Sequence, residues 1–129
     1  MTSGPADRAR VLCDVAARAA DAPGDAGGAL WRLAEPGRQL DANLVRLPPG
    51  HRVGAHREPE LDVLLLVVEG SGALDDGVEI QQLTGGTLVW LPQGSARELA
   101  AGPDGLAYLT VHRRRPGMQI GSGPPAAVG

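Results

Sequence analysis

The sequence predicts an all-β domain of short strands joined by tight turns, with one helix at its N-terminal end. Of its 129 residues, 19 are glycine and 11 are proline, and that many of both cannot sit inside long helices. The hydrophobic share is 43%, which a disordered chain would not carry. Strand-like segments alternate with turn signals, which is typical of an antiparallel sandwich or barrel rather than of βαβ units.

We expect three parts in the chain: an N-terminal helix and linker over residues 1–27, a β-barrel domain over residues 28–116, and a flexible tail over residues 117–129. The helix should cover residues 5–20, where leucine, valine and alanine recur at helical spacing. Pro23 followed by Gly24 should end it. Cys13 falls in this helix as a small hydrophobic residue.

The predicted strands begin where the helical period disappears. They cover residues 28–33, 40–47, 61–69, 78–83, 87–91 and 106–114. The run Val63–Val68 is apolar at every position, so both faces of that strand should be covered. One face would lie inside the barrel. The other would pack on the helix, a second sheet or another subunit, and we expect a homodimer.

Composition and charge exclude several kinds of partner. All 12 basic residues are arginine against 15 acidic ones, and the net charge of -3 leaves no electrostatic footprint for nucleic acid. The basic run Arg113–Arg115 reads as a solvated strand end. No apolar run is long enough for a membrane span or a signal peptide. The single cysteine excludes an internal disulfide, so we expect a cytoplasmic protein. From the charge and the short apolar runs, we expect it to bind neither nucleic acid nor a membrane.

Two stretches of the chain match the motifs of a known family of small β-barrels. Residues 50–70 read GHRVGAHREPELDVLLLVVEG, and residues 86–97 read GTLVWLPQGSAR. Over about residues 40 to 115 the chain resembles the cupin superfamily of small bacterial barrels. That resemblance implies a cupin-type double-stranded β-helix, the jelly-roll barrel. Its framework residues would be Gly50, Gly70, Gly86, Pro92 and Gly94, and the glycines fall where positive φ is often needed.

The chemistry of cupins usually depends on three histidines and a glutamate that bind a divalent metal. His56 matches the first histidine, but Glu58, Val63 and Arg97 stand at the other three positions. Val63 has no donor atom, and the permanent positive charge of Arg97 would repel a cation. We therefore expect neither a metal nor another cofactor.

The resemblance places Glu58 and Arg97 in one cavity, where they could form a charge-assisted pair in the space that a metal takes elsewhere. A metal bound by His56, Glu58 and either His112 or Asp62 stays open as the alternative.

Strand alternation puts Tyr108, Thr110 and His112 on one face of the last strand. The sequence does not decide whether that face is inward.

The predicted function is the binding of a small molecule, such as a carboxylate or another anion, inside the barrel. The polar anchors would be His56, Glu58 and Arg97. Aliphatic residues would line the cavity: Leu44, Leu65, Val67, Val89 and Leu109.

Two other functions stay open. One is a metal-dependent or acid/base enzyme, dioxygenase-like or isomerase-like, that uses His56 and Glu58. The other is a structural or regulatory dimeric module whose barrel is filled by side chains. No serine or cysteine lies in a recognisable arrangement with a base, so no catalytic residue is assigned.

Overall fold

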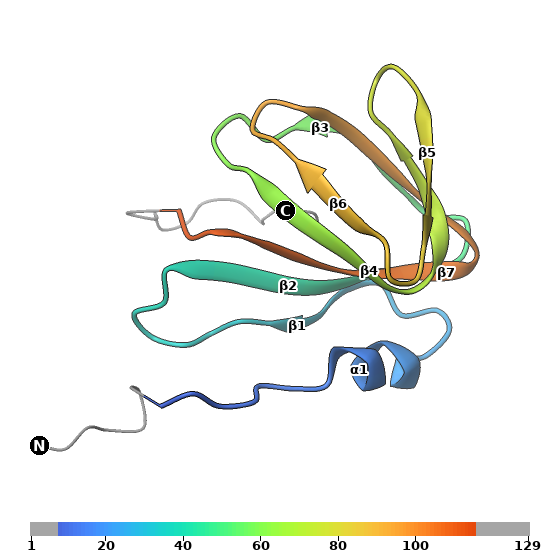
Figure 1. Cartoon of the computed structure of the whole chain (residues 1–129). Coiled ribbons are helices and arrows are strands. Elements are labelled where there is room, and N and C mark those ends of the chain that lie inside the picture. Colours follow the sequence, from blue (N-terminus) through green and yellow to red (C-terminus); the bar gives the residue numbers. More distant parts are fainter. Residues whose placement is uncertain (1–7, 116–129) are drawn as a thin grey trace, which may run out of the picture.

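The computed structural model describes residues 8–115, and in this range the chain is antiparallel β-structure with one short helix (Figure 1). The elements are α1 (Val15–Asp21), β1 (Gly28–Arg32), β2 (Leu40–Leu47), β3 (Arg52–Arg57), β4 (Val63–Asp75), β5 (Ile80–Thr84), β6 (Leu88–Leu91) and β7 (Ala96–Arg113). The predicted all-β fold class is therefore confirmed, whereas the expected tail over residues 117–129 lies outside the described residues. Within this range no helix has the length and apolar character needed to cross a membrane.

Two long strands, β4 and β7, organise the barrel because each serves two layers. They pair with each other along most of their length. In the first layer, Val63–Leu66 of β4 also pair with β6, and Leu106–Arg113 of β7 also pair with β2, which pairs in turn with β1. In the second layer, β7 pairs with β3 and β4 pairs with β5. The two layers enclose the core in a jelly-roll arrangement.

The layers are joined by a bend in β4 and β7 that only glycines can form. Gly70 has a φ of +84°, and a Cβ on it would clash with the carbonyl oxygen of Gly105, whose φ is +83°. A side chain at Gly72 would likewise collide with the carbonyl oxygen of Ala100. The prediction of a strand that ends at residue 69 is wrong, because the backbone passes through the bend and its pairing with β7 resumes beyond it.

The glycines of the predicted framework have the backbone conformation expected of them. The φ angles of Gly50, Gly70, Gly86 and Gly94 are all positive, from +76° to +92°. Three of these glycines lie in connections between strands, while Gly70 lies inside β4.

The sequence prediction misses β3 and the first part of β7. Arg52–Arg57 carries arginine, histidine and glycine instead of an apolar alternation, which suits a strand at the edge of its layer. The strand predicted over residues 106–114 is only the second part of β7. The strand over residues 40–47 has the predicted bounds. Those over residues 28–33, 78–83 and 87–91 differ at their ends by one or two residues.

The helix is shorter than the prediction of residues 5–20. It begins at Val15, because the side chain of Asp14 accepts a hydrogen bond from the backbone N–H of Ala17 (3.1 Å) and caps the first turn. It ends before the Pro-Gly pair, as expected. Cys13 therefore precedes the helix and is partly buried.

The core between the layers is almost wholly aliphatic. Its members are Val45, Leu47, Leu61, Val63, Leu65, Val67, Leu74, Leu83, Leu91, Leu99, Leu106 and Tyr108. In the run Val63–Val68, the side chains of Val63, Leu65 and Val67 point into this core, whereas Leu64 is 42% exposed on the other side. The expectation that both faces of this strand are covered therefore fails at Leu64 within the described chain.

Candidate ligand-binding site

Three segments meet at one end of the barrel, and we call them the rim: the loop of residues 58–62, the turn of residues 92–95 and the end of β7 at residues 112–115. The backbone N–H of Gly94 donates to the carbonyl oxygen of Glu58 (2.7 Å), and that of Gln93 donates to the carboxylate of Asp62 (2.9 Å). The side chain of Arg115 forms an ion pair with Glu58. Figure 1 shows the β3–β4 and β6–β7 connections side by side at this end.

Arg97 is the most deeply buried charged side chain of the described residues, with 1% of its surface exposed. Its Nη2 donates to Ser95 Oγ (3.3 Å). Burial lowers the pKa of Arg97, and the negative charge of Glu58 opposes that shift. The two residues that the motifs place in one cavity are therefore close enough to interact electrostatically, and the guanidinium stays protonated.

Glu58 also has a second cationic neighbour, which the sequence analysis missed. One of its carboxylate oxygens takes part in the ion pair with Arg115, and the other accepts from the backbone N–H of Glu60 (2.9 Å). The interpretation of the run 113–115 as a solvated strand end is wrong for Arg115. The sequence shows that this run lies at the end of the last strand. Only the tertiary structure shows that it lies next to the β3–β4 loop.

His56 lies directly opposite Arg97 in the β3–β7 pairing, so their side chains share a face of the layer. The ring Nδ1 of His56 lies 3.3 Å from the carbonyl oxygen of Gly54. A carbonyl oxygen only accepts, so this nitrogen carries the proton of the hydrogen bond.

The inner wall of the barrel contributes further polar side chains, all of them from β7. Tyr108 and Thr110 are fully buried, and His112 is 8% exposed, so the face that they share is inward. The Nδ1 of His112 donates to the carbonyl oxygen of Arg113 (2.8 Å). The hydroxyl oxygens of Tyr108 and Thr110 have no hydrogen-bond partner within residues 8–115. Burial raises the pKa of Tyr108, which keeps its hydroxyl protonated and able to donate.

The predicted aliphatic lining divides between the two faces of the first layer. Leu65 and Val67 belong to the core, and Val89 packs against it. The placement of Leu44 and Leu109 in the cavity is wrong. They pair with each other on the outer face, because the side chains that flank them along β2 and β7 point inward.

The donor set for the metal that the resemblance implies is not assembled in the described part of the chain. Within residues 8–115 no group of three or more His, Cys, Asp or Glu side chains could hold a metal ion. The alternative set of His56, Glu58 and His112 therefore does not form such a group. Val63, opposite His112 in the β4–β7 pairing, offers only methyl groups, and Arg97 supplies a positive charge. The residues present do not fit a divalent metal.

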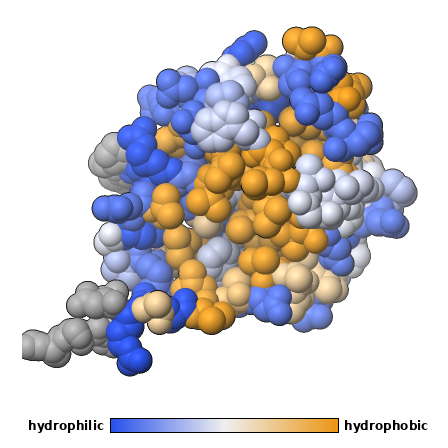
Figure 2. Space-filling model, viewed as in Figure 1, coloured by the Kyte–Doolittle hydropathy of each residue, from blue (hydrophilic) through white to orange (hydrophobic). Residues whose placement is uncertain are grey.

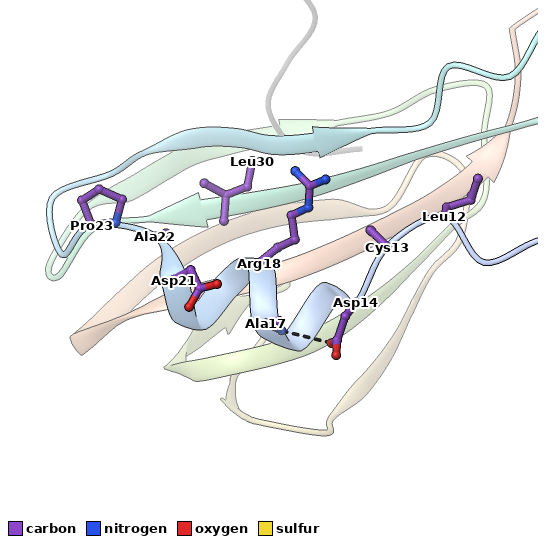
Figure 3. A pocket seen from close by; sticks show the side chains of 9 residues that line it. All are labelled: Leu12, Cys13, Asp14, Ala17, Arg18, Asp21, Ala22, Pro23 and Leu30. Atoms are coloured by element: carbon purple, nitrogen blue, oxygen red, sulfur yellow. Dashed lines mark hydrogen bonds between the residues drawn. The ribbon is translucent and has the colours of Figure 1, made fainter.

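A separate hollow lies outside the barrel, between α1 and β1 (Figure 3). It is lined by Leu12, Cys13, Asp14, Ala17, Arg18, Asp21, Ala22, Pro23 and Leu30. The carboxylate of Asp14 is already bonded to the first turn of α1, as the dashed line in Figure 3 marks. This hollow contains none of the predicted site residues, and we place the candidate site at the rim and the adjoining inner wall of the barrel.

Comparison with solved structures identifies the fold. A cupin domain of Cnp3 from Schizosaccharomyces pombe matches at a TM-score of 0.59 and 12% identity over 66% of this chain and 59% of that one. A sugar phosphate isomerase of the cupin superfamily from Silicibacter pomeroyi matches at 0.56 and 26% identity, over 61% and 53%. A cupin-2 domain protein from Shewanella frigidimarina matches at 0.56 and 16% identity, over 69% and 80%.

The region matched spans less than two thirds of the Schizosaccharomyces and Silicibacter chains. No family model and no curated protein sequence matches this chain. The fold and the site define a small jelly-roll barrel with an arginine at its polar end. The chain has the cupin fold, as the resemblance of its two motifs implies.

Proposed function

We propose that the barrel binds a small organic anion of the carboxylate class, without a metal. Arg97 would hold the anion at the rim, and the hydroxyls of Tyr108 and Thr110 would donate hydrogen bonds to it. The observation that carries the proposal is the pair of buried hydroxyls that have no partner in the described chain. Buried polar groups are nearly always hydrogen-bonded, and a bound ligand is one way to satisfy these two.

The charge of the rim supports an anion. The Glu58 carboxylate acts on Arg97 and is ion-paired to Arg115. One negative charge is thus shared between two guanidinium groups, which leaves a net positive charge beside the buried end of Arg97. Carboxylates are held well by such a group because its charge-assisted hydrogen bonds are about twice as strong as neutral ones. The aliphatic side chains of Leu65 and Val67 suit the organic part of the molecule.

The acid/base alternative has no supporting contact. Glu58 is the proposed partner of His56 in that chemistry, but both of its carboxylate oxygens are engaged, with Arg115 and with the N–H of Glu60. The other alternative is a structural module whose barrel is filled by side chains. In that case the hydroxyls of Tyr108 and Thr110 would be buried without a hydrogen bond, and each would cost about 1–3 kcal/mol of stability.

The proposal is tested by calorimetric titration of the full chain with a panel of small mono- and dicarboxylates and with inorganic phosphate. We expect at least one carboxylate to bind and to raise the melting temperature. Tyr108→Phe and Thr110→Val should each weaken that binding about tenfold, the effect of one lost hydrogen bond. Thr84→Val, which removes an exposed hydroxyl on β5, is the matched control. The proposal fails if nothing in the panel binds, or if Tyr108→Phe binds as well as the wild type.

The absence of a metal is tested by elemental analysis of the purified protein, where near-stoichiometric iron, manganese, nickel or zinc would overturn it. The cytoplasmic location expected from the single cysteine stays a prediction, and cell fractionation would test it.

A further inference from the structure

A second hollow outside the barrel lies between the end of α1 and the bend of β4 and β7, and we call it the polar hollow. Its volume of about 350 Å³ lies at the lower end of the range of small-molecule sites. It is lined by Ala19, Ala20, Ala22, Arg46, Glu69, Gly70 and Asp104. Figure 1 places α1 below this bend. Figure 2 shows hydrophobic residues gathered across the middle of the face that carries β4 and β6, so the charged lining of the hollow contrasts with that face.

Arg46 gives this hollow a buried positive charge. Its side chain is 8% exposed, and Nη1 donates to the backbone carbonyl oxygens of residues 24 and 26. Nη2 lies against Gly105, where a Cβ would come within 2.8 Å of it, so the glycine leaves room for the guanidinium. Within residues 8–115, Nη2 has no hydrogen-bond acceptor and Arg46 has no ion pair. The N–H groups of Nη2 are therefore left to bind an acceptor from outside the chain.

Glu69 gives the same hollow a negative charge, across the sheet from Arg46. Both residues lie opposite Ala107, Arg46 in the β2–β7 pairing and Glu69 in the β4–β7 pairing. Residues directly opposite each other point the same way, so the two side chains leave the sheet on one face, about 10 Å or two strand spacings apart. Asp104 adds a second carboxylate, and it is exposed like Glu69. In the described chain neither carboxylate forms an ion pair.

The mixture of charges indicates the kind of ligand. A metal ion would meet the guanidinium, and no group of three or more suitable side chains in the described range could hold one. A simple anion would meet two carboxylates. A small zwitterion suits both signs, because its carboxylate accepts from Arg46 and its ammonium donates to Glu69 and Asp104. We propose that the polar hollow binds a free amino acid through these three side chains. This site is separate from the one proposed inside the barrel.

The test is calorimetric titration of the full chain at neutral pH with a panel of free amino acids. We expect at least one of them to bind. The amide of that amino acid keeps the ammonium but lacks the carboxylate, so it should bind at least about tenfold more weakly. Glu69→Gln should weaken binding of the amino acid about tenfold, because one partner of the ammonium loses its charge. Glu79→Gln is the matched control, since Glu79 is exposed in the connection between β4 and β5 and does not line the hollow.

A steric variant tests the place of binding without altering a charge. Ala20 is exposed on α1 and lines the hollow, so Ala20→Leu should occupy that space and weaken binding at least about tenfold. Leucine is a good helix former, and Ala16→Leu, which is exposed on α1 outside the hollow, should bind like the wild type.

The proposal is overturned if no amino acid of the panel binds, or if Ala20→Leu binds as well as the wild type. Tyr108→Phe separates this site from the barrel and should leave the binding unchanged. Binding that this variant abolishes belongs to the barrel and overturns the proposal as well. A barrel that binds no carboxylate leaves the expected result at the polar hollow unchanged.

Discussion

Glu58 and Arg115 are ion-paired although they lie 57 residues apart in the chain. The pair joins the loop before β4 to the segment that follows β7. It also engages the carboxylate that would otherwise act on Arg97 alone. The electrostatic character of the rim therefore depends on a residue that belongs to neither of the two cupin motifs.

Removing that arginine should reduce anion binding. In Arg115→Gln, the Glu58 carboxylate would be free to neutralise Arg97, so we expect affinity for the bound carboxylate to fall about tenfold, measured by calorimetry. Stability should change by about 1 kcal/mol or less, because Arg115 is half exposed. Arg114→Gln is the control, and equal loss in both variants would point to a general charge effect.

Tyr108→Phe should leave the ligand-free protein as stable as the wild type or slightly more stable. The hydroxyl is buried and has no hydrogen-bond partner in the described chain, so its removal relieves a desolvation cost of about 1–3 kcal/mol. Urea unfolding measures the effect. A clear loss of stability would mean that the hydroxyl is bonded in the free protein.

Gly70→Ala should destabilise the protein by about 3 kcal/mol or more. Its φ of +84° disfavours any side chain, and the added Cβ would clash with the backbone of Gly105. Gly54→Ala is the matched control in urea unfolding, because a Cβ at Gly54 would meet no atom within 4 Å. Similar losses at both positions would contradict the tight bend.

Arg46 should hold the connection between α1 and β1 in place. Its side chain is 8% exposed, and Nη1 donates to the carbonyl oxygens of Gly24 (2.8 Å) and Ala26 (2.9 Å). We expect Arg46→Met to cost about 2–3 kcal/mol and to speed amide exchange in residues 22–27. Arg32→Met, on the exposed end of β1, should do neither. If exchange in that segment is unchanged, the hydrogen bonds of Arg46 do not control it.

Asp76 should make stability depend on pH in the acid range. Hydrogen bonds from the backbone N–H of Glu79, from that of Val78 and from the side chain of Gln81 lower its pKa below the ordinary value of 3.8. A depressed folded-state pKa adds stability above the unfolded value, and that contribution is lost as the pH falls through the folded value. The stability advantage of the wild type over Asp76→Asn should therefore be present at neutral pH and be lost progressively in the acid range, as the pH falls through the folded-state pKa. An advantage that is the same at both pH values would contradict this role.

Much of the fold was predictable from local patterns. Turn chemistry placed Gly50, Gly86 and Gly94 at positive φ, and strand alternation placed Tyr108, Thr110 and His112 on one face. These features depend on a residue and its near neighbours, whose steric limits are the same in any fold.

Other features depended on partners far away in the chain. The polar strand β3 exists because β7 pairs with it, and β4 continues past residue 69 because two glycine-bearing strands bend together. The two motifs predicted that Glu58 and Arg97 lie close together. That Arg115 forms an ion pair with Glu58 is visible only in the tertiary structure, because the two residues are far apart in the chain.

The apolar run Val63–Val68 was readable from the sequence as a strand with two apolar faces. Which of its side chains would be buried, and that Leu64 and Trp90 would lie beyond the reach of the helix, was decided by the tertiary structure. Hydrophobicity is a property of each residue, whereas burial depends on which surfaces the whole chain brings into contact.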